Sequence, residues 1–246
     1  MTDLYLEREY SRFIQERDLL HKYPIEELID IIKDVGFGCT QCGRCCSTEQ
    51  NGHVFLLQQD TEKALNLYPE TVIPAPFFEI CDRNGRFFVS GYALRTKPDG
   101  TCIHLTEGQC RIYQNRFSIC RIYPYMLHRE PDERGRLNFR QISGLNEHGS
   151  YHTNISDAEI LTIAQETIAY EKKWLNQMIG FYEALKDLFQ SSGERHIRKI
   201  YDQKMREFRK GVPVEVYVYH NGQFIRHTVS IPDYAGIIPL PLNTDR

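Results

Sequence analysis

Cys39-Thr40-Gln41-Cys42-Gly43-Arg44-Cys45-Cys46 decides the fold, because it places four thiols within eight residues at the spacing C-x2-C-x2-C-C. Thiols gathered this densely predict a bound metal ion, an iron–sulfur cluster or disulfides. Bonds to a metal can replace part of the apolar core that a segment otherwise needs for folding. Three further cysteines follow at Cys102, Cys110 and Cys120.

Disulfides are the weakest of these explanations. The adjacent Cys45 and Cys46 cannot readily bridge each other, and two-residue gaps favour chelation. Residues 1–11 carry charges and no apolar signal-peptide core, and no run of about 18 apolar residues predicts a membrane helix. We therefore expect a cytoplasmic chain whose thiols stay reduced and free to bind metal.

Composition sets broad limits on partners. The net charge of the 246 residues is −3, from 30 Lys and Arg against 33 Asp and Glu, so we expect neither nucleic acid nor a membrane as partner. The hydrophobic fraction of 41% excludes wholesale disorder. A run of cations over residues 195–210 predicts the solvated face of a helix rather than a docking surface. If the metal serves a larger system, the partner is a protein of unknown identity.

Apolar periodicity predicts an α+β fold, in which a small irregular cysteine-rich core with short strands and hairpins packs against long C-terminal helices. We expect a single domain over 1–246, with a metal-binding core at 36–128, a helical extension at 150–210 and a hairpin and tail at 211–246. Expected helices cover 3–22, 24–36, 61–68 with Asp60 as its cap, one long helix from about Ser156, and 194–210. Expected hairpins surround Asn84-Gly85, as a type I′ turn, and Asn221-Gly222.

The spacing Cys39, Cys42, Cys45 suits a [4Fe–4S] cluster, because one tight loop reaches three irons and a distant cysteine supplies the fourth ligand. A plain ferredoxin is disfavoured, since Glu49 and Gln50 stand where the ferredoxin pattern needs cysteine and proline. Zinc competes, because it takes the same thiolates tetrahedrally and eight cysteines could fill two zinc sites.

The cysteine knuckle, residues 39–46, resembles the CxxCxxCC, or YkgJ-type, family of zinc- or iron-chelating and Fe–S-cluster-containing proteins. The resemblance rests equally on a later segment, Cys110-Arg111-Ile112-Tyr113-Gln114-Asn115-Arg116-Phe117-Ser118-Ile119-Cys120-Arg121-Ile122-Tyr123-Pro124. The resemblance covers about residues 36–128. Phe117 departs from it where the family prefers proline, and His104 lies where the family often has another residue after Cys102. The resemblance implies a metal-binding core whose ligands are Cys39, Cys42, Cys45, Cys46, Cys102, Cys110 and Cys120.

Other residues near the thiols have weaker expectations. Arg116 and Arg121 also lie in the family motif, and as cofactor-binding residues they would donate hydrogen bonds to the sulfurs of an anionic cluster. His104 is the best candidate among the histidines for an additional ligand. Cys81 lies outside the pattern, so we expect a buried core thiol.

Three functions stay open on these grounds. The first is an iron–sulfur protein, [4Fe–4S] in type, that acts in electron transfer, cluster handling or redox sensing. The second is a zinc-stabilised protein-interaction module, and the third is a metal-dependent protein-modifying enzyme. The sequence carries no phosphate-binding glycine loop, no G-x-S-x-G elbow and no H-E-x-x-H helix, so it names no reaction and no catalytic residue.

Overall fold

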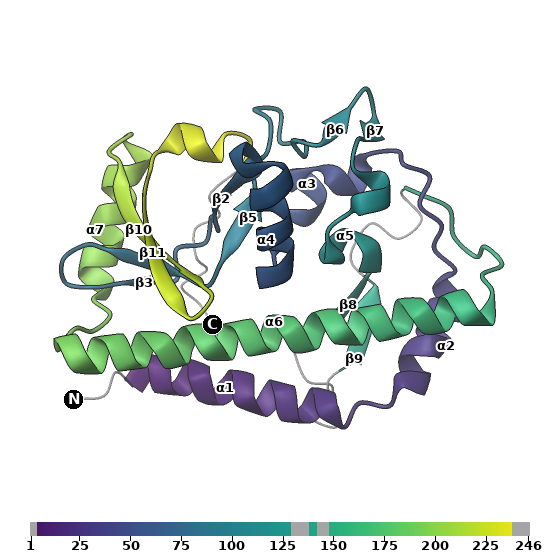
Figure 1. The fold of residues 1–246 in the computed structure, drawn as a ribbon, viewed down its shortest axis with the longest axis horizontal. Helices are drawn as coiled ribbons and strands as arrows, with labels where there is room; N and C mark the ends of the chain where they lie inside the picture. The colour runs from purple at the N-terminus through teal and green to yellow at the C-terminus, as the bar shows by residue number, and fades with distance from the viewer. Residues whose placement is uncertain (1–3, 129–137, 142–147, 238–246) are drawn as a thin grey trace.

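The long helix α6, Asp157–Ser192, is the axis of the structure, a computed structural model that describes residues 4–128, 138–141 and 148–237 (Figure 1). The helix begins where the sequence predicts, because the Ser156 side chain caps it by accepting a 3.3 Å hydrogen bond from the Glu159 backbone N–H. Its end lies at Gly193, which adopts the left-handed conformation at φ 65°. The helix runs through Gly180, where a side chain would meet the hydroxyl of Tyr219.

Two N-terminal helices pack on one side of α6, and most of the strands and the cysteine segments lie on the other, whereas strand β9, Asn138–Gln141, contacts the second of these helices (Figure 1). Helix α1, Leu4–His21, lies along α6, and α2, Ile25–Val35, packs near its N-terminal end. The predicted stripe on α6 is buried at Ile160, Leu175 and Tyr182, whereas Ile168 is half-buried. The core between these helices also holds Leu6, Phe13, Leu20, Leu28 and Ile32.

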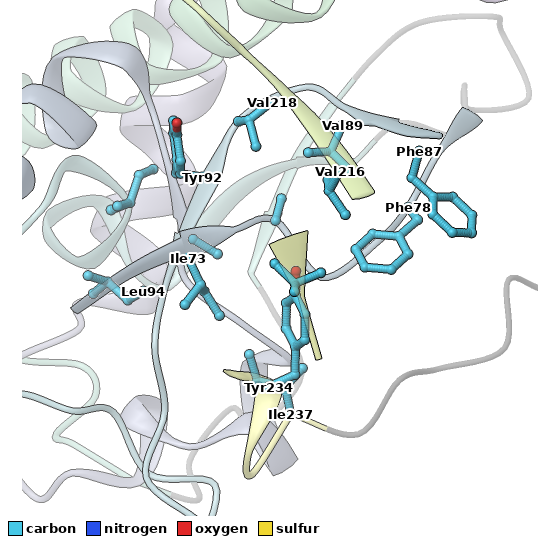
Figure 2. Close-up of a cluster of buried hydrophobic side chains, with 14 of the residues drawn as sticks. Ile73, Phe78, Phe87, Val89, Tyr92, Leu94, Val216, Val218, Tyr234 and Ile237 are labelled. Carbon is cyan, nitrogen blue, oxygen red and sulfur yellow. The ribbon is translucent and has the colours of Figure 1, made fainter. Parts of the chain in front are cut away.

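A four-stranded sheet in the order β11-β10-β4-β3 joins the C-terminal hairpin to the middle of the chain. Strand β10, Val214–His220, pairs in parallel with β4, Phe87–Val89, so that Val216 lies beside Phe87. Figure 2 shows the apolar cluster on this sheet. Residues near the C-terminus cover it, namely the 3-10 turn η4, Ile231–Tyr234, and Ile237. Helix α7, Arg198–Arg209, adds Tyr201 and Phe208 to it.

The other elements are mostly short. They are α3 Thr48–Asn51, α4 Gln58–Leu67, α5 Ser118–Ile122, β1 Phe55–Leu56, β2 Val72–Pro74, β3 Ile80–Cys81, β5 Tyr92–Leu94, β6 Leu105–Thr106, β7 Gln109–Cys110, β8 Tyr125–His128, β9 Asn138–Gln141, β11 Gln223–Val229 and the 3-10 turns η1 Arg44–Cys46, η2 Pro69–Thr71 and η3 Tyr113–Asn115. The mixed α+β class is thus confirmed.

Two local expectations are wrong. The type I′ turn forms at Asn221-Gly222, where both residues have positive φ, but Asn84 does not have positive φ. Instead the Asp82 carbonyl accepts a 3.2 Å hydrogen bond from the Gly85 N–H, and the Asp82 carboxylate braces this turn by accepting hydrogen bonds from the backbone N–H groups of Asn84 and Arg86. Asp60 does not cap its own helix either, because α4 begins before it and its carboxylate points to another segment.

None of the helices in the described part of the chain combines the length and the apolar character that crossing a membrane requires.

Candidate metal centre

The knuckle that carries the first four thiols is held at both ends. Gly36 ends α2 in the left-handed conformation, and Gly38 forms a β-bridge with Ser150. Gly43, at φ 78°, starts the 3-10 turn η1 and lies against Leu105. These glycines let the backbone turn sharply, so that cysteines two residues apart can face the same region.

Cys46 is the link between the knuckle and the later cysteines. Its carbonyl accepts a 2.7 Å hydrogen bond from the Cys102 backbone N–H, and the flanking Ser47 and Thr101 form a β-bridge. Cys110 lies one short hairpin further on, in β7, opposite Leu105 of β6. Three chain segments therefore meet at Cys46, although up to 64 residues separate it from Cys110 in sequence.

The electrostatics identify an inner group of four thiols, Cys46, Cys102, Cys110 and Cys120. Burial, followed by the charges of Cys46 and Cys110, raises the pKa of Cys102 to about 11. Burial, followed by Cys102, Cys46 and Cys110, raises the pKa of Cys120 well above its ordinary value. Each thiolate thus destabilises the others, which is the situation that a bound cation would relieve.

Two of the three outer thiols lie nearer to solvent than the inner group. Cys39 and Cys42 are exposed, and Cys45 is half-buried with its carbonyl bonded by Asn51 Nδ2 at 2.7 Å. A hydrogen bond between the Cys45 and Cys46 side chains, followed by burial, raises the pKa of Cys46. Cys45 therefore joins the outer group to the inner one. The eight cysteines, Cys81 included, are all free thiols, and Cys81 is fully buried in the core.

The two candidate arginines lie in different surroundings. The charge of Arg116 opposes the rise in the pKa of Cys46, Cys110 and Cys120, so its guanidinium lies within electrostatic reach of the inner group. It stacks 3.9 Å above the ring of Tyr113, which itself hydrogen-bonds the Cys39 side chain. Arg121 instead forms a 3.5 Å ion pair with Glu166 of α6.

The two nearest histidines also differ. His53 lines a partly open pocket of about 20 Å³ together with Cys45, Cys46 and Cys102, a volume that suits about one water molecule. The imidazole of His104 packs against Tyr68, with 4.9 Å between ring centroids, and its Nε2 is buried without a hydrogen-bond partner. His53 therefore lies beside the thiols, and the expectation that His104 is an additional ligand stays a prediction.

The donor set fits a thiophilic metal, because it offers several soft thiols that are partly shielded from water and a guanidinium that offsets their charge. As they stand, no three His, Cys, Asp or Glu side chains among the described residues are close enough together to hold a metal ion. The backbone gathers the thiols, and ligation would need their side chains to turn inward. The ligand set, with Arg116 and Arg121, stays a prediction.

Two supporting residues were not predicted. Asn51 holds the knuckle through the Cys45 carbonyl, and Asp60 accepts hydrogen bonds from Ser118, two residues before Cys120. Asn51 follows the cysteine run closely, so its amide was a visible signal for a loop-bracing residue. Asp60 carried no such signal, because 58 residues separate it from its partner.

Comparison with known proteins supports a cysteine-cluster segment of the zinc- or iron-chelating kind within this α+β chain. Residues 38–142 match the CxxCxxCC family model, described as "Putative zinc- or iron-chelating domain", so the predicted resemblance is confirmed. An uncharacterized protein of Methanocaldococcus jannaschii is 31% identical over 97 residues, which are 38% of this chain. The chain spans about half the length of that curated relative, 47% of it. No solved structure matches.

Proposed function

We propose that the cysteine centre binds an iron–sulfur cluster, [4Fe–4S] in type, and serves electron transfer, cluster handling or redox sensing. The observation that supports this most is the inner group of Cys46, Cys102, Cys110 and Cys120, of which Cys46, Cys110 and Cys120 lie within electrostatic reach of the guanidinium of Arg116. A cluster held by four thiolates is anionic, and a nearby guanidinium stabilises such a charge.

The position of the outer thiols supports a transfer or sensing role. Cys39 and Cys42 are exposed, so a group held by the knuckle would lie near the surface. A centre at the surface is accessible to a protein partner, a small reductant or an oxidant. The compartment we propose is the cytoplasm, where thiols stay reduced.

Zinc is the second candidate, because the matching family description names zinc and iron alike. Four thiolates also satisfy a structural zinc site, which would make the segment an interaction module with no redox role. The inner group alone has enough thiols for one such site.

Purification without oxygen decides between an iron–sulfur cluster and zinc. We expect brown protein with absorbance near ~400 nm, acid-labile sulfide and stoichiometric iron. Colourless protein with stoichiometric zinc would contradict the iron–sulfur proposal and support the zinc module. Protein that takes up neither metal after reconstitution would contradict both.

A further inference from the structure

Helix α5, which carries Cys120, is attached at its first residue to helix α4. The Ser118 backbone N–H lies 3.2 Å from both carboxylate oxygens of Asp60, and the Ser118 hydroxyl donates to Oδ1 at 3.1 Å. Both side chains are buried, with 6% of Asp60 and 7% of Ser118 exposed. A buried carboxylate is costly unless it is hydrogen-bonded, so these three contacts bind the two helices firmly together.

Neighbouring contacts extend the attachment to both sides. Gln59 Nε2 donates to the Ser118 hydroxyl at 3.2 Å, and Lys63 Nζ donates to the Asn115 carbonyl at 2.6 Å. Lys173 of α6 donates in turn to Gln59 Oε1 at 2.6 Å. The turn before Cys120 is thus held by α4, and α4 is held by the central helix.

The attachment acts on Cys120 over a very short stretch of backbone. Cys120 is the third residue of α5, and its N–H bonds to the Phe117 carbonyl at 3.0 Å. Since α5 has five residues, it cannot keep its direction through its own hydrogen bonds. What fixes its first turn therefore also fixes where the Cys120 side chain points.

We propose that Asp60 is a positioning residue for the metal centre, which holds the Cys120 thiol toward Cys46, Cys102 and Cys110 through its bonds to Ser118. This inference rests on the proposed function, since it needs Cys120 to be a ligand. It concerns a residue outside the cysteine motifs, on a helix that carries no candidate ligand.

Titration of the chain with Co²⁺ tests it, because thiolate-bound Co²⁺ reports ligand geometry through its visible and charge-transfer bands. We expect Asp60→Ala to weaken Co²⁺ binding by about 10- to 100-fold and to shift the bands, as loss of a supporting hydrogen bond does in other metal sites. Asp60→Asn keeps an acceptor for Ser118 and should stay within about threefold of the original chain. Glu62→Ala, an exposed acid on the same helix, is the matched control.

A second variant removes the same bonds from the other side. Ser118→Pro deletes both donors at the first helical residue, where proline is tolerated, and the extended Phe117 backbone before it, at φ −69° and ψ 159°, suits a following proline. We expect it to weaken Co²⁺ binding as Asp60→Ala does. If Asp60→Ala fails to fold, the Co²⁺ affinities and bands of Ser118→Pro and Asp60→Asn are compared instead, and this comparison tests the positioning role.

The outcomes separate the two proposals. Unchanged affinity and bands in folded Asp60→Ala, or in Ser118→Pro, would overturn the positioning role and leave the metal site standing. A lower thermal midpoint with unchanged affinity and bands would show a merely structural cap and overturn it equally. An original chain that binds neither Co²⁺ nor an iron–sulfur cluster would overturn the proposed function itself, and this inference with it.

Discussion

The backbone N–H of Cys102 donates a 2.7 Å hydrogen bond to the carbonyl of Cys46, and this bond joins the knuckle to the second cysteine segment. It gives the two adjacent thiols Cys45 and Cys46 different surroundings. Cys46 is within electrostatic reach of Cys102, Cys110 and Cys120, whereas Cys45 is hydrogen-bonded to the Cys46 side chain.

The first prediction concerns these neighbours. We expect Cys46→Ser to lose most of its bound metal, because the change removes a thiolate from the inner group. Cys45→Ser should retain more metal, since it removes an outer thiol. The measurement is metal content per chain after purification without oxygen. Equal retention by both variants would contradict the division into inner and outer groups.

Cys81→Ser is the matched control for that experiment. Cys81 is a fully buried free thiol in the core, and its Sγ contacts the Asp82 carbonyl at 3.5 Å. We expect full metal content and a loss of about 1–3 kcal/mol in the free energy of unfolding, because a hydroxyl is more costly to bury than a thiol. Loss of metal in this variant, with Cys120→Ser unaffected, would show that the site has other cysteines.

The second prediction is a pH dependence caused by Glu79, a half-buried residue whose carboxylate oxygen Oε2 is fully buried. Burial raises the pKa of Glu79 from 4.5 to about 8, against a 2.7 Å hydrogen bond from Ser90 Oγ that opposes the rise. The native chain therefore holds a proton between these two values that the unfolded chain releases. Its contribution to stability is fully present below about pH 4.5 and is lost as the pH rises toward about 8.

Glu79→Gln should remove this contribution to the pH dependence of the free energy of unfolding, and its amide oxygen still accepts the hydrogen bond from Ser90. We expect the variant to gain stability relative to the original chain as the pH rises from 5 to 8, measured by urea unfolding at each pH. Glu62→Gln, exposed on α4, should leave the slope unchanged. Parallel curves for Glu79→Gln and the original chain would contradict a protonated Glu79.

Sequence periodicity predicted the helices well and the contacts between distant segments poorly. The stripe from Ile160 to Tyr182 and the cap Ser156 are local signals, because one helix face or one turn decides them. The parallel pairing of Val216 with Phe87 is not local, since alternation along a strand says nothing about which strand lies beside it.

The candidate site divides in the same way. The spacing from Cys39 to Cys46 predicted chelation, because short gaps limit what neighbouring thiols can do. It could not predict that Cys46 would lie within electrostatic reach of the three later cysteines, because this depends on the backbone bond to Cys102. Nor could it predict Asp60, whose local position resembles a helix cap and whose bonds go to Ser118 instead.

The third prediction concerns the entrance to the knuckle. Gly36 adopts φ 52°, and a side chain there would come within 2.8 Å of the Thr153 backbone nitrogen. The left-handed conformation alone costs a residue with a side chain about 1–2 kcal/mol. We expect Gly36→Ala to lower the free energy of unfolding by more than this. Gly222→Ala is the control, since Gly222 has φ 76° with nothing within 4 Å. Equal losses in urea unfolding would show that the approach of Thr153 is unimportant.

The last prediction is that metal supports one part of the fold and not the other. Between Thr101 and Ile122 the strands β6 and β7 have two residues each and α5 has five, so no long helix or strand holds this segment through a regular series of backbone hydrogen bonds. Helices α1 and α6 instead bury side chains such as Phe13 and Leu175 almost completely.

We expect removal of the metal by a chelator to speed amide hydrogen exchange in residues 101–122 by at least about tenfold, or about 1.4 kcal/mol of local stability, and to leave α1 and α6 unchanged. Mass spectrometry of exchanged peptides measures both regions in one sample. Equal acceleration in α1 and α6 would show that the metal supports the whole chain, and no acceleration in 101–122 would show that this segment orders itself without it.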